Sequence, residues 1–203
     1  MDVISTPQIL YHGTTEFCLN SFRTKLLDNS YWHPGRDFGE GFYTTTSILQ
    51  ARKWARKAEK GAVPQSRACV LEIELIGVPE HIVPQVFLGI SASWGTYIFA
   101  HRRVKKKNED PCEMHAELII GPMADNDTGK IVQDAVSLKK DERWFYDKIT
   151  RNLKGRRLDA LRLGNQVVFS SERWESSLRL IGYYIYAGSR WMYYENSRTV
   201  ESV

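Results

Sequence analysis

The stretch Leu10-Tyr11-His12-Gly13-Thr14-Thr15 predicts a short strand that runs into a Gly/Thr turn. A second stretch, Asp37-Phe38-Gly39-Glu40-Gly41-Phe42-Tyr43-Thr44-Thr45, has turn-forming residues in its first half and β-forming residues in its second. A helix is predicted directly after it, because Ser47 is a good N-cap, Gln50 follows at capping-box spacing and Gly61 can end the helix. The fold therefore starts with two short strands and a helix.

The rest of the chain predicts further short strands mixed with helices. Strands are expected over residues 69–75, 117–122 and 166–170, and helices over residues 126–136, 139–154 and 172–178. Residues 20–40 are polar and are expected to be irregular. The helix over 139–154 is expected to bury Trp144, Phe145, Ile149 and Leu153. Near the end, Tyr183–Ala187 and Arg190–Tyr194 flank Gly188-Ser189, a two-residue hairpin loop. Because strands and helices do not alternate regularly, this pattern indicates an α+β fold.

Length and composition indicate one globular domain. The chain has 203 residues, of which 42% are hydrophobic and 26% charged, enough for one substantial core. We expect a single domain over residues 1–203, with the hairpin at 181–195 as an addition. No apolar run is long enough to span a bilayer, so no membrane contact is expected. Three widely spaced cysteines argue against a disulfide framework and favour a reducing compartment.

The N-terminal residues lack the basic and apolar regions of a secretory signal, so we expect a cytoplasmic protein, with export by other machinery left open. Positive charge is concentrated in two segments. Residues 102–107 hold five Lys or Arg and no acid, and residues 139–157 hold eight Lys or Arg against three acids. Two such segments suit an anionic partner such as nucleic acid, although two solvated surfaces would give the same pattern.

Common catalytic and metal motifs are absent from the sequence. There is no Walker A sequence, no Gly-x-Ser-x-Gly and no His-Glu-x-x-His. Gly39-Glu40-Gly41 lacks the third glycine of a dinucleotide-binding turn and runs into a predicted strand. His101, Cys112 and His115 match the spacing of no common zinc site. We therefore predict no metal.

Five short motifs occur in the order found in one family. The chain resembles the ADP-ribosyltransferase superfamily in its His-Tyr-Glu branch, which includes diphtheria-toxin-like enzymes and poly(ADP-ribose) polymerases, and within it a family of bacterial toxin-like proteins. The resemblance covers about residues 9–180. The motifs are Tyr11-His12-Gly13, the Asp37–Tyr43 stretch, Ala51-x-x-Trp54-Ala55, Ile120-Gly121-Pro122-Met123-Ala124-Asp125 and Asn165-Gln166. The resemblance implies a split β-sandwich with peripheral helices, to which the C-terminal hairpin is added.

The resemblance implies NAD as substrate and no metal. His12 would hydrogen-bond a ribose hydroxyl, Tyr43 would stack on the nicotinamide and the Gly13 backbone would grip its carboxamide. The residues implied to bind the cofactor are Gly13, Thr14, Gly41 and Trp54. The residue types suit this ligand, because a flat ring that carries positive charge needs an aromatic face and a backbone that can approach closely.

The third catalytic position departs from the family, because Gln166 stands where the superfamily has glutamate. A glutamine can hydrogen-bond a ribose hydroxyl but supplies no negative charge. Another acid could supply charge, with Asp37 the first candidate and Glu117 and Asp125 after it; otherwise the chemistry relies on positioning, or the protein is inactive.

The resemblance implies a mono-ADP-ribosyltransferase, because polymer elongation goes with the missing glutamate. Bacterial members are typically injected effectors, or toxins of toxin–antitoxin and phage-defence systems, which act in the bacterial or a host cytosol. The basic segments favour RNA or DNA over protein as the acceptor. The alternatives are an NAD glycohydrolase and a non-catalytic NAD- or partner-binding module. The aromatic hairpin is expected either to be buried on both faces or to leave one aromatic face exposed for a partner. That partner would be an antitoxin or chaperone, nucleic acid or a second copy of the chain.

Overall fold

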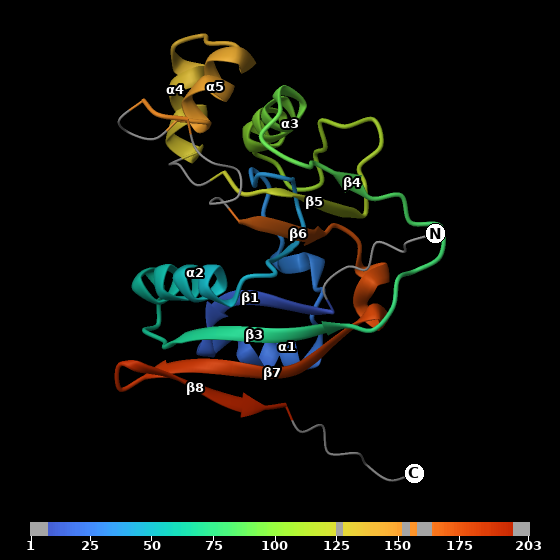
Figure 1. Cartoon of the computed structure of the whole chain (residues 1–203), viewed down its shortest axis with the longest axis vertical. Coiled ribbons are helices and arrows are strands. Elements are labelled where there is room, and N and C mark those ends of the chain that lie inside the picture. The colour runs from blue at the N-terminus through green and yellow to red at the C-terminus, as the bar shows by residue number, and fades with distance from the viewer. Residues whose placement is uncertain (1–7, 125–127, 152–154, 158–163, 197–203) are drawn as a thin grey trace. The chain divides into compact units, whose positions relative to one another are not determined.

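The computed structural model of the chain describes residues 8–124, 128–151, 155–157 and 164–196 (Figure 1). The fold is α+β, with two sheets and several helices. The chain forms two compact units, each assembled from separated segments. Unit 1 comprises Met1–Leu27, Thr44–Glu80 and Arg173–Val203, and unit 2 comprises Asp28–Tyr43 and His81–Glu172.

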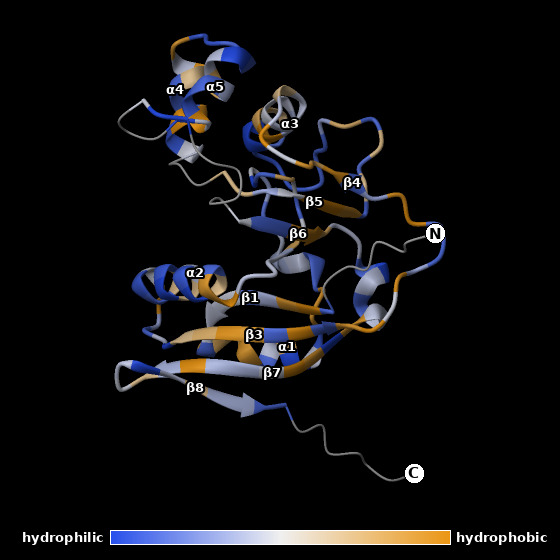
Figure 2. Cartoon of the chain, viewed as in Figure 1, coloured by the Kyte–Doolittle hydropathy of each residue, from blue (hydrophilic) through white to orange (hydrophobic). Residues whose placement is uncertain are grey.

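Unit 1 is built on sheet A, four antiparallel strands in the order β1-β3-β7-β8. The strands are β1 (Ile9–Thr15), β3 (Ala68–Leu75), β7 (Leu178–Ala187) and β8 (Arg190–Glu195). Most of β3 is buried, as its run of apolar residues predicts for a strand with neighbours on both sides (Figure 2). The interior position of β7 follows from the same order, because it pairs with both β3 and β8.

The long helix of unit 1 begins where its capping residue predicts. The long helix α2 (Ile48–Gly61) lies along β1 and β3 (Figure 1). Ser47 Oγ accepts a hydrogen bond from the Gln50 N–H at 3.4 Å, so the predicted N-cap is confirmed. In a capping box the Ser47 N–H would donate to the Gln50 side chain, and here it donates to Thr45 Oγ1 at 3.1 Å. The remaining elements are η1 (Glu16–Cys18), α1 (Leu19–Thr24) and η3 (Glu172–Ser177), whose first residue belongs to unit 2.

Unit 2 is built on sheet B, with strand order β2-β6-β5-β4. Its strands are β2 (Phe42–Thr44), β4 (Gln85–Val86), β5 (Leu118–Pro122) and β6 (Asn165–Phe169). Strands β5 and β6 are antiparallel, and β4 and β5 are parallel. The helical elements are η2 (Asn29–Tyr31), α3 (Ala92–Arg103), α4 (Thr128–Ser137) and α5 (Glu142–Ile149). One buried cluster forms the core, and it includes Trp94, Ile98, Phe145 and Val168 from these elements and Phe38 from the turn before β2.

Most predicted elements are confirmed, two predictions are wrong and one helix was missed. Residues 20–40 are not wholly irregular, because α1 and η2 form there. The helix predicted over 139–154 is shorter, since Asp141 caps α5 by accepting from the Trp144 N–H, and Trp144 is only half-buried. Helix α3 was not predicted at all. Some predicted positions lie outside the described residues. They are the candidate acid Asp125 and, in the predicted helices, residues 126 and 127 and Leu153.

The missed helix α3 is stabilised by packing more than by helix propensity. It contains Gly95 and several β-forming residues, which lower its propensity. A Cβ on Gly95 would lie 2.6 Å from Tyr146 Cδ2, so glycine lets α3 pack closely against α5. In the described part of the chain, no helix has both the length and the apolarity needed to cross a membrane.

Candidate functional site

Gly13 in β1 lets α2 pack directly against sheet A. A Cβ at Gly13 would lie 2.8 Å from the Ala55 backbone nitrogen and closer still to the Ala51 carbonyl oxygen. Both neighbours are backbone atoms of α2, so they cannot move without moving the helix. The glycine therefore has a packing role that its sequence context did not indicate.

The peptide groups of Gly13 point to the outer edge of sheet A. The strand order begins with β1, so β1 is an edge strand. Tyr11 and Thr45 exchange backbone hydrogen bonds of 2.8 and 2.9 Å across the edge away from β3. Because backbone groups alternate along a strand, the N–H and C=O of Gly13 point to this same edge. An edge of this kind offers one donor and one acceptor side by side.

Strand alternation divides the four predicted residues of unit 1 between two faces of sheet A. Gly13 and the half-buried Trp54 come together, since Trp54 Cβ would lie 3.0 Å from a Cβ at Gly13. His12 and Thr14 point to the opposite face. The His12 ring lies 5.2 Å from the Phe22 ring of α1, and Thr14 is buried.

In unit 2, Asp37 and Gln166 are joined by a buried hydrogen bond. Gln166 Nε2 donates to Asp37 Oδ2 at 3.2 Å, although the two residues are 129 positions apart in the sequence. The other carboxylate oxygen, Oδ1, accepts from Arg102 Nε at 2.7 Å. Asp37 is 5% exposed and Gln166 2% exposed. Both oxygens of Asp37 thus have a donor, and its negative charge is paired with Arg102.

Tyr43 holds the turn that precedes it. Its hydroxyl donates to the Gly39 carbonyl at 2.7 Å and accepts from the Phe38 N–H at 2.9 Å. Burial raises the pKa of this hydroxyl, and the charge of Asp37 raises that pKa further. The ring packs against the core of unit 2. Gly41 is needed for packing, because a Cβ there would lie 2.8 Å from the Phe169 carbonyl oxygen of β6.

Of the two other acids considered for the site, Glu117 lies at the far end of its strand from Gln166. In the ladder of β5 and β6, Gln166 pairs with Gly121, whereas the Glu117 carbonyl accepts from the Ser170 N–H at the other end. Four residues of strand separate Glu117 from Gly121, which corresponds to about 13 Å. Asp125 lies outside the described residues. Of the three candidates, only Asp37 is shown in contact with Gln166.

Arg102 is the residue that the sequence analysis missed. It belongs to the basic segment 102–107, which the charge pattern assigned to the surface, yet it also donates to the Gly35 carbonyl at 3.2 Å. Lys107 Nζ likewise donates to the carbonyls of Asn29 and Ser30, at 2.8 and 2.9 Å. Part of this segment therefore holds unit 2 together. Asp37 was already a candidate site residue, and a carboxylate in a buried site needs a cationic partner, so this requirement could have pointed to an arginine.

A family model for DUF3990, described as a protein of unknown function, matches residues 8–180. The chain belongs to the DUF3990 family. The match covers β1, the Asp37–Tyr43 stretch and β6, so every predicted site residue lies inside the DUF3990 region. No curated protein and no solved structure shows significant similarity to the chain.

The DUF3990 match ends inside β7, at a strand that pairs on both sides. The predicted hairpin of β7 and β8 is confirmed, but its first strand is an interior strand of sheet A. Aromatic pairs face one another across it, namely Tyr183–Tyr194, Tyr184–Tyr193 and Tyr186–Trp191. Tyr193 and Tyr194 are 48% and 40% exposed, so the aromatic residues are not all buried.

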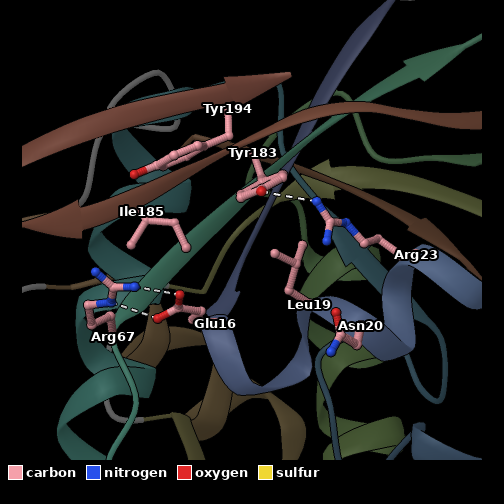
Figure 3. A pocket seen from close by; sticks show the side chains of 8 residues that line it. All are labelled: Glu16, Leu19, Asn20, Arg23, Arg67, Tyr183, Ile185 and Tyr194. Atoms are coloured by element: carbon pink, nitrogen blue, oxygen red, sulfur yellow. Dashed lines mark hydrogen bonds and ion pairs between the residues drawn. The ribbon is translucent and has the colours of Figure 1, made fainter. Parts of the chain in front are cut away.

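The two aromatic faces of the hairpin have different surroundings. On the α2 side, Arg52 lies over the Tyr184 and Trp191 rings, and Arg56 lies 4.0 Å from the Tyr186 ring centre. The other side borders a pocket of about 340 Å³ (Figure 3). This pocket is lined by Glu16, Leu19, Asn20, Arg23, Arg67, Tyr183, Ile185 and Tyr194. Its two arginines already have partners, because Arg67 forms two 2.6 Å bonds to Glu16 and Arg23 donates to the Tyr183 hydroxyl.

Proposed function

We propose that the protein is an NAD-dependent mono-ADP-ribosyltransferase with an ADP-ribosyltransferase-like split β-sandwich. The observation that carries the proposal is the buried hydrogen bond from Gln166 to Asp37. The resemblance assigns both residues to the site on separate motifs, and nothing in their spacing requires them to meet. The two four-stranded sheets are consistent with the proposed sandwich.

Gln166 would orient the ribose. Its Nε2 donates to Asp37, which leaves the amide oxygen as the acceptor end of the side chain. A ribose hydroxyl of NAD would donate to this oxygen. Arg102 fixes Asp37, and Asp37 in turn fixes the rotation of the amide. Holding the ribose in one orientation would lower the barrier to breaking its bond to nicotinamide.

The pairing of Asp37 with Arg102 favours a mechanism in which the site orients the ribose over one in which a free carboxylate stabilises its positive charge. Breaking the nicotinamide–ribose bond leaves positive charge on the ribose ring, and a nearby free carboxylate would stabilise it. Asp37 already neutralises a guanidinium at 2.7 Å, so little of its charge is left for the ribose. We therefore expect slow, single transfers and no polymer.

In unit 1, the edge of β1 would bind the nicotinamide. A carboxamide has one NH₂ donor and one oxygen acceptor, and the Gly13 backbone presents the complementary pair on one edge. Trp54 is close enough to Gly13 to provide an aromatic wall. His12 would hydrogen-bond a ribose hydroxyl, and its side chain lies on the other face of β1.

The test is incubation of the full chain with NAD labelled in its adenylate phosphate, with total RNA, duplex DNA and a protein extract offered separately. Label transferred to a macromolecule, with release of nicotinamide, is the expected result, and RNA or DNA is the expected acceptor. Free ADP-ribose alone would indicate a glycohydrolase. Neither product, in a chain shown to be folded, would overturn the proposal and leave a binding module.

A further inference from the structure

Three side chains with metal-binding atoms meet at the end of α3. His101 lies in the last turn of the helix, and Asp110 and Cys112 lie in the segment that follows. His101 Nε2 is 3.6 Å from Cys112 Sγ and 3.6 Å from Asp110 Oδ1. All three donor atoms lie within 4.8 Å of one another. Their sequence spacing matches no common zinc site, because a loop brings the residues together.

The imidazole of His101 is oriented as a ligand. It is 1% exposed, and its Nδ1–H donates to the Tyr97 carbonyl at 2.8 Å. This bond places the ring proton on Nδ1 and leaves the lone pair on Nε2, the atom nearest the thiol and the carboxylate. A backbone carbonyl that fixes the far nitrogen of a histidine is a common support for metal ligands.

The atoms and their separations suit a zinc-type cation. Metal bonds of about 2.0–2.3 Å in a tetrahedron put neighbouring N, O and S ligands about 3.3–3.6 Å apart. Thiolate and imidazole ligands favour zinc over magnesium or calcium, which prefer oxygen. We propose that His101, Asp110 and Cys112 bind one Zn²⁺ ion, with water as the fourth ligand. On binding, the Cys112 thiol loses its proton to solvent and the thiolate sulfur bonds to the metal.

A buried hydroxyl beside the cluster supports the proposal independently. The Tyr97 hydroxyl is buried and lies against the Cys112 side chain, to which its hydrogen-bond geometry is poor. It lies next to Cys112, and a metal-bound thiolate accepts hydrogen bonds more strongly than a thiol. His115 flanks the cluster with Nε2 at 3.8 Å from Asp110 Oδ2, but it donates to the Phe38 carbonyl at 3.1 Å. We therefore leave His115 outside the ligand set.

The metal would hold the Asp37–Tyr43 turn against α3. Gly39 has a φ of +82°, and a Cβ there would lie 2.9 Å from both His101 Cδ2 and His115 Nε2. Backbone and imidazoles are thus in direct contact at this turn. A metal that fixes His101 would fix the surface on which the turn rests. This effect on the turn does not depend on the proposed NAD chemistry.

The experiment is metal titration of the full chain after treatment with a chelator. Zn²⁺ should bind at one equivalent per chain and raise the thermal midpoint. Co²⁺ should give the charge-transfer absorption of a cobalt–thiolate bond. Cys112→Ser should remove that absorption and weaken zinc binding at least tenfold, and Asp110→Asn, at an exposed position, should weaken it in the same direction.

Cys18→Ser is the matched control, because Cys18 is equally half-buried but its thiol faces Thr15 Oγ1 at 3.6 Å. It should bind both metals like the unaltered chain. Absence of stoichiometric zinc binding, or a cobalt spectrum without thiolate absorption, would overturn the proposal. So would a Cys112→Ser chain that binds zinc as tightly as the unaltered chain. None of these readouts uses NAD, so their failure is distinct from failure of the proposed function.

Discussion

The two units hold their predicted site residues by different means. In unit 1, Gly13 and Trp54 are placed by backbone packing, because α2 lies directly on β1. In unit 2, Asp37, Tyr43 and Gln166 are placed by polar side-chain contacts in a largely buried environment. Substitutions in unit 1 should therefore act through steric conflict, whereas those in unit 2 should act through groups left without partners.

The largest effect should come from Gly13→Ala. The added Cβ would meet two backbone atoms of α2 at less than 3 Å, so the helix must shift. We expect a loss of about 3 kcal/mol or more in the free energy of unfolding. Chemical denaturation checks this. Gly61→Ala is the control, because a Cβ there meets nothing within 4 Å and should be neutral or slightly stabilising. Equal stability of the two variants would contradict the packing of α2 on β1.

Arg102→Met should have the next largest effect. It leaves the buried Asp37 carboxylate without its cation, and we expect a loss of about 2–3 kcal/mol in the free energy of unfolding. Adding Asp37→Asn should recover part of this loss, because the unpaired charge is then removed. A thermodynamic cycle over the two single variants and the double variant measures the coupling. Additive losses would show that the two side chains do not interact.

The same contrast explains what the sequence could predict. Strands β1, β3 and β6 and helix α2 carry their own signals, namely apolar runs, a Ser47 cap and turn residues at their ends, and they form close to the predicted bounds. Helix α3 has a serine cap of the same kind, since Ser91 Oγ accepts from the Trp94 N–H at 3.1 Å, but its glycine and β-forming residues weaken the helical pattern and are compensated by contacts with α5. Local patterns predict elements whose stability is local, and they fail where tertiary packing decides.

The candidate site shows the same limit. Asp37 and Gln166 could be singled out from motifs, but their contact depends on chain segments 129 residues apart. Arg102 was assigned to the surface because its neighbours are basic, and only the fold reveals its carboxylate partner. His101, Cys112 and His115 were set aside on spacing, and Asp110, which lies in the cluster with His101 and Cys112, was not considered. Single-sequence spacing cannot show which loops fold back.

Tyr43→Phe should have a smaller effect. It removes the hydroxyl that bridges Phe38 and Gly39 and leaves the ring in the core, so we expect a loss of about 1–2 kcal/mol in the free energy of unfolding. Tyr194→Phe is the control, because this residue is 40% exposed and should change stability by less than about 0.5 kcal/mol. Thermal unfolding of both variants checks this. A neutral Tyr43→Phe would mean that the turn does not depend on the bridge.

The smallest effect on stability should come from the exposed part of the basic segment. Lys105→Ala with Lys106→Ala should leave the fold unchanged, because both side chains are exposed. If nucleic acid is the acceptor, the same change should reduce the salt dependence of binding by about two counterions. Lys107 is left in place, since it donates to two carbonyls of unit 2. Salt-independent binding would favour a protein acceptor.

The most direct test of the account compares nicotinamide release by the unaltered chain, by His12→Ala, by Gln166→Ala and by the double variant, each shown to be folded by circular dichroism. One variant alters unit 1 and the other unit 2. If both residues serve one reaction on NAD, each single change should lower the rate at least tenfold, about 1.4 kcal/mol, and the double variant should lose much less than the product of the two. No nicotinamide release from the unaltered chain, or full release from either single variant, would contradict the account.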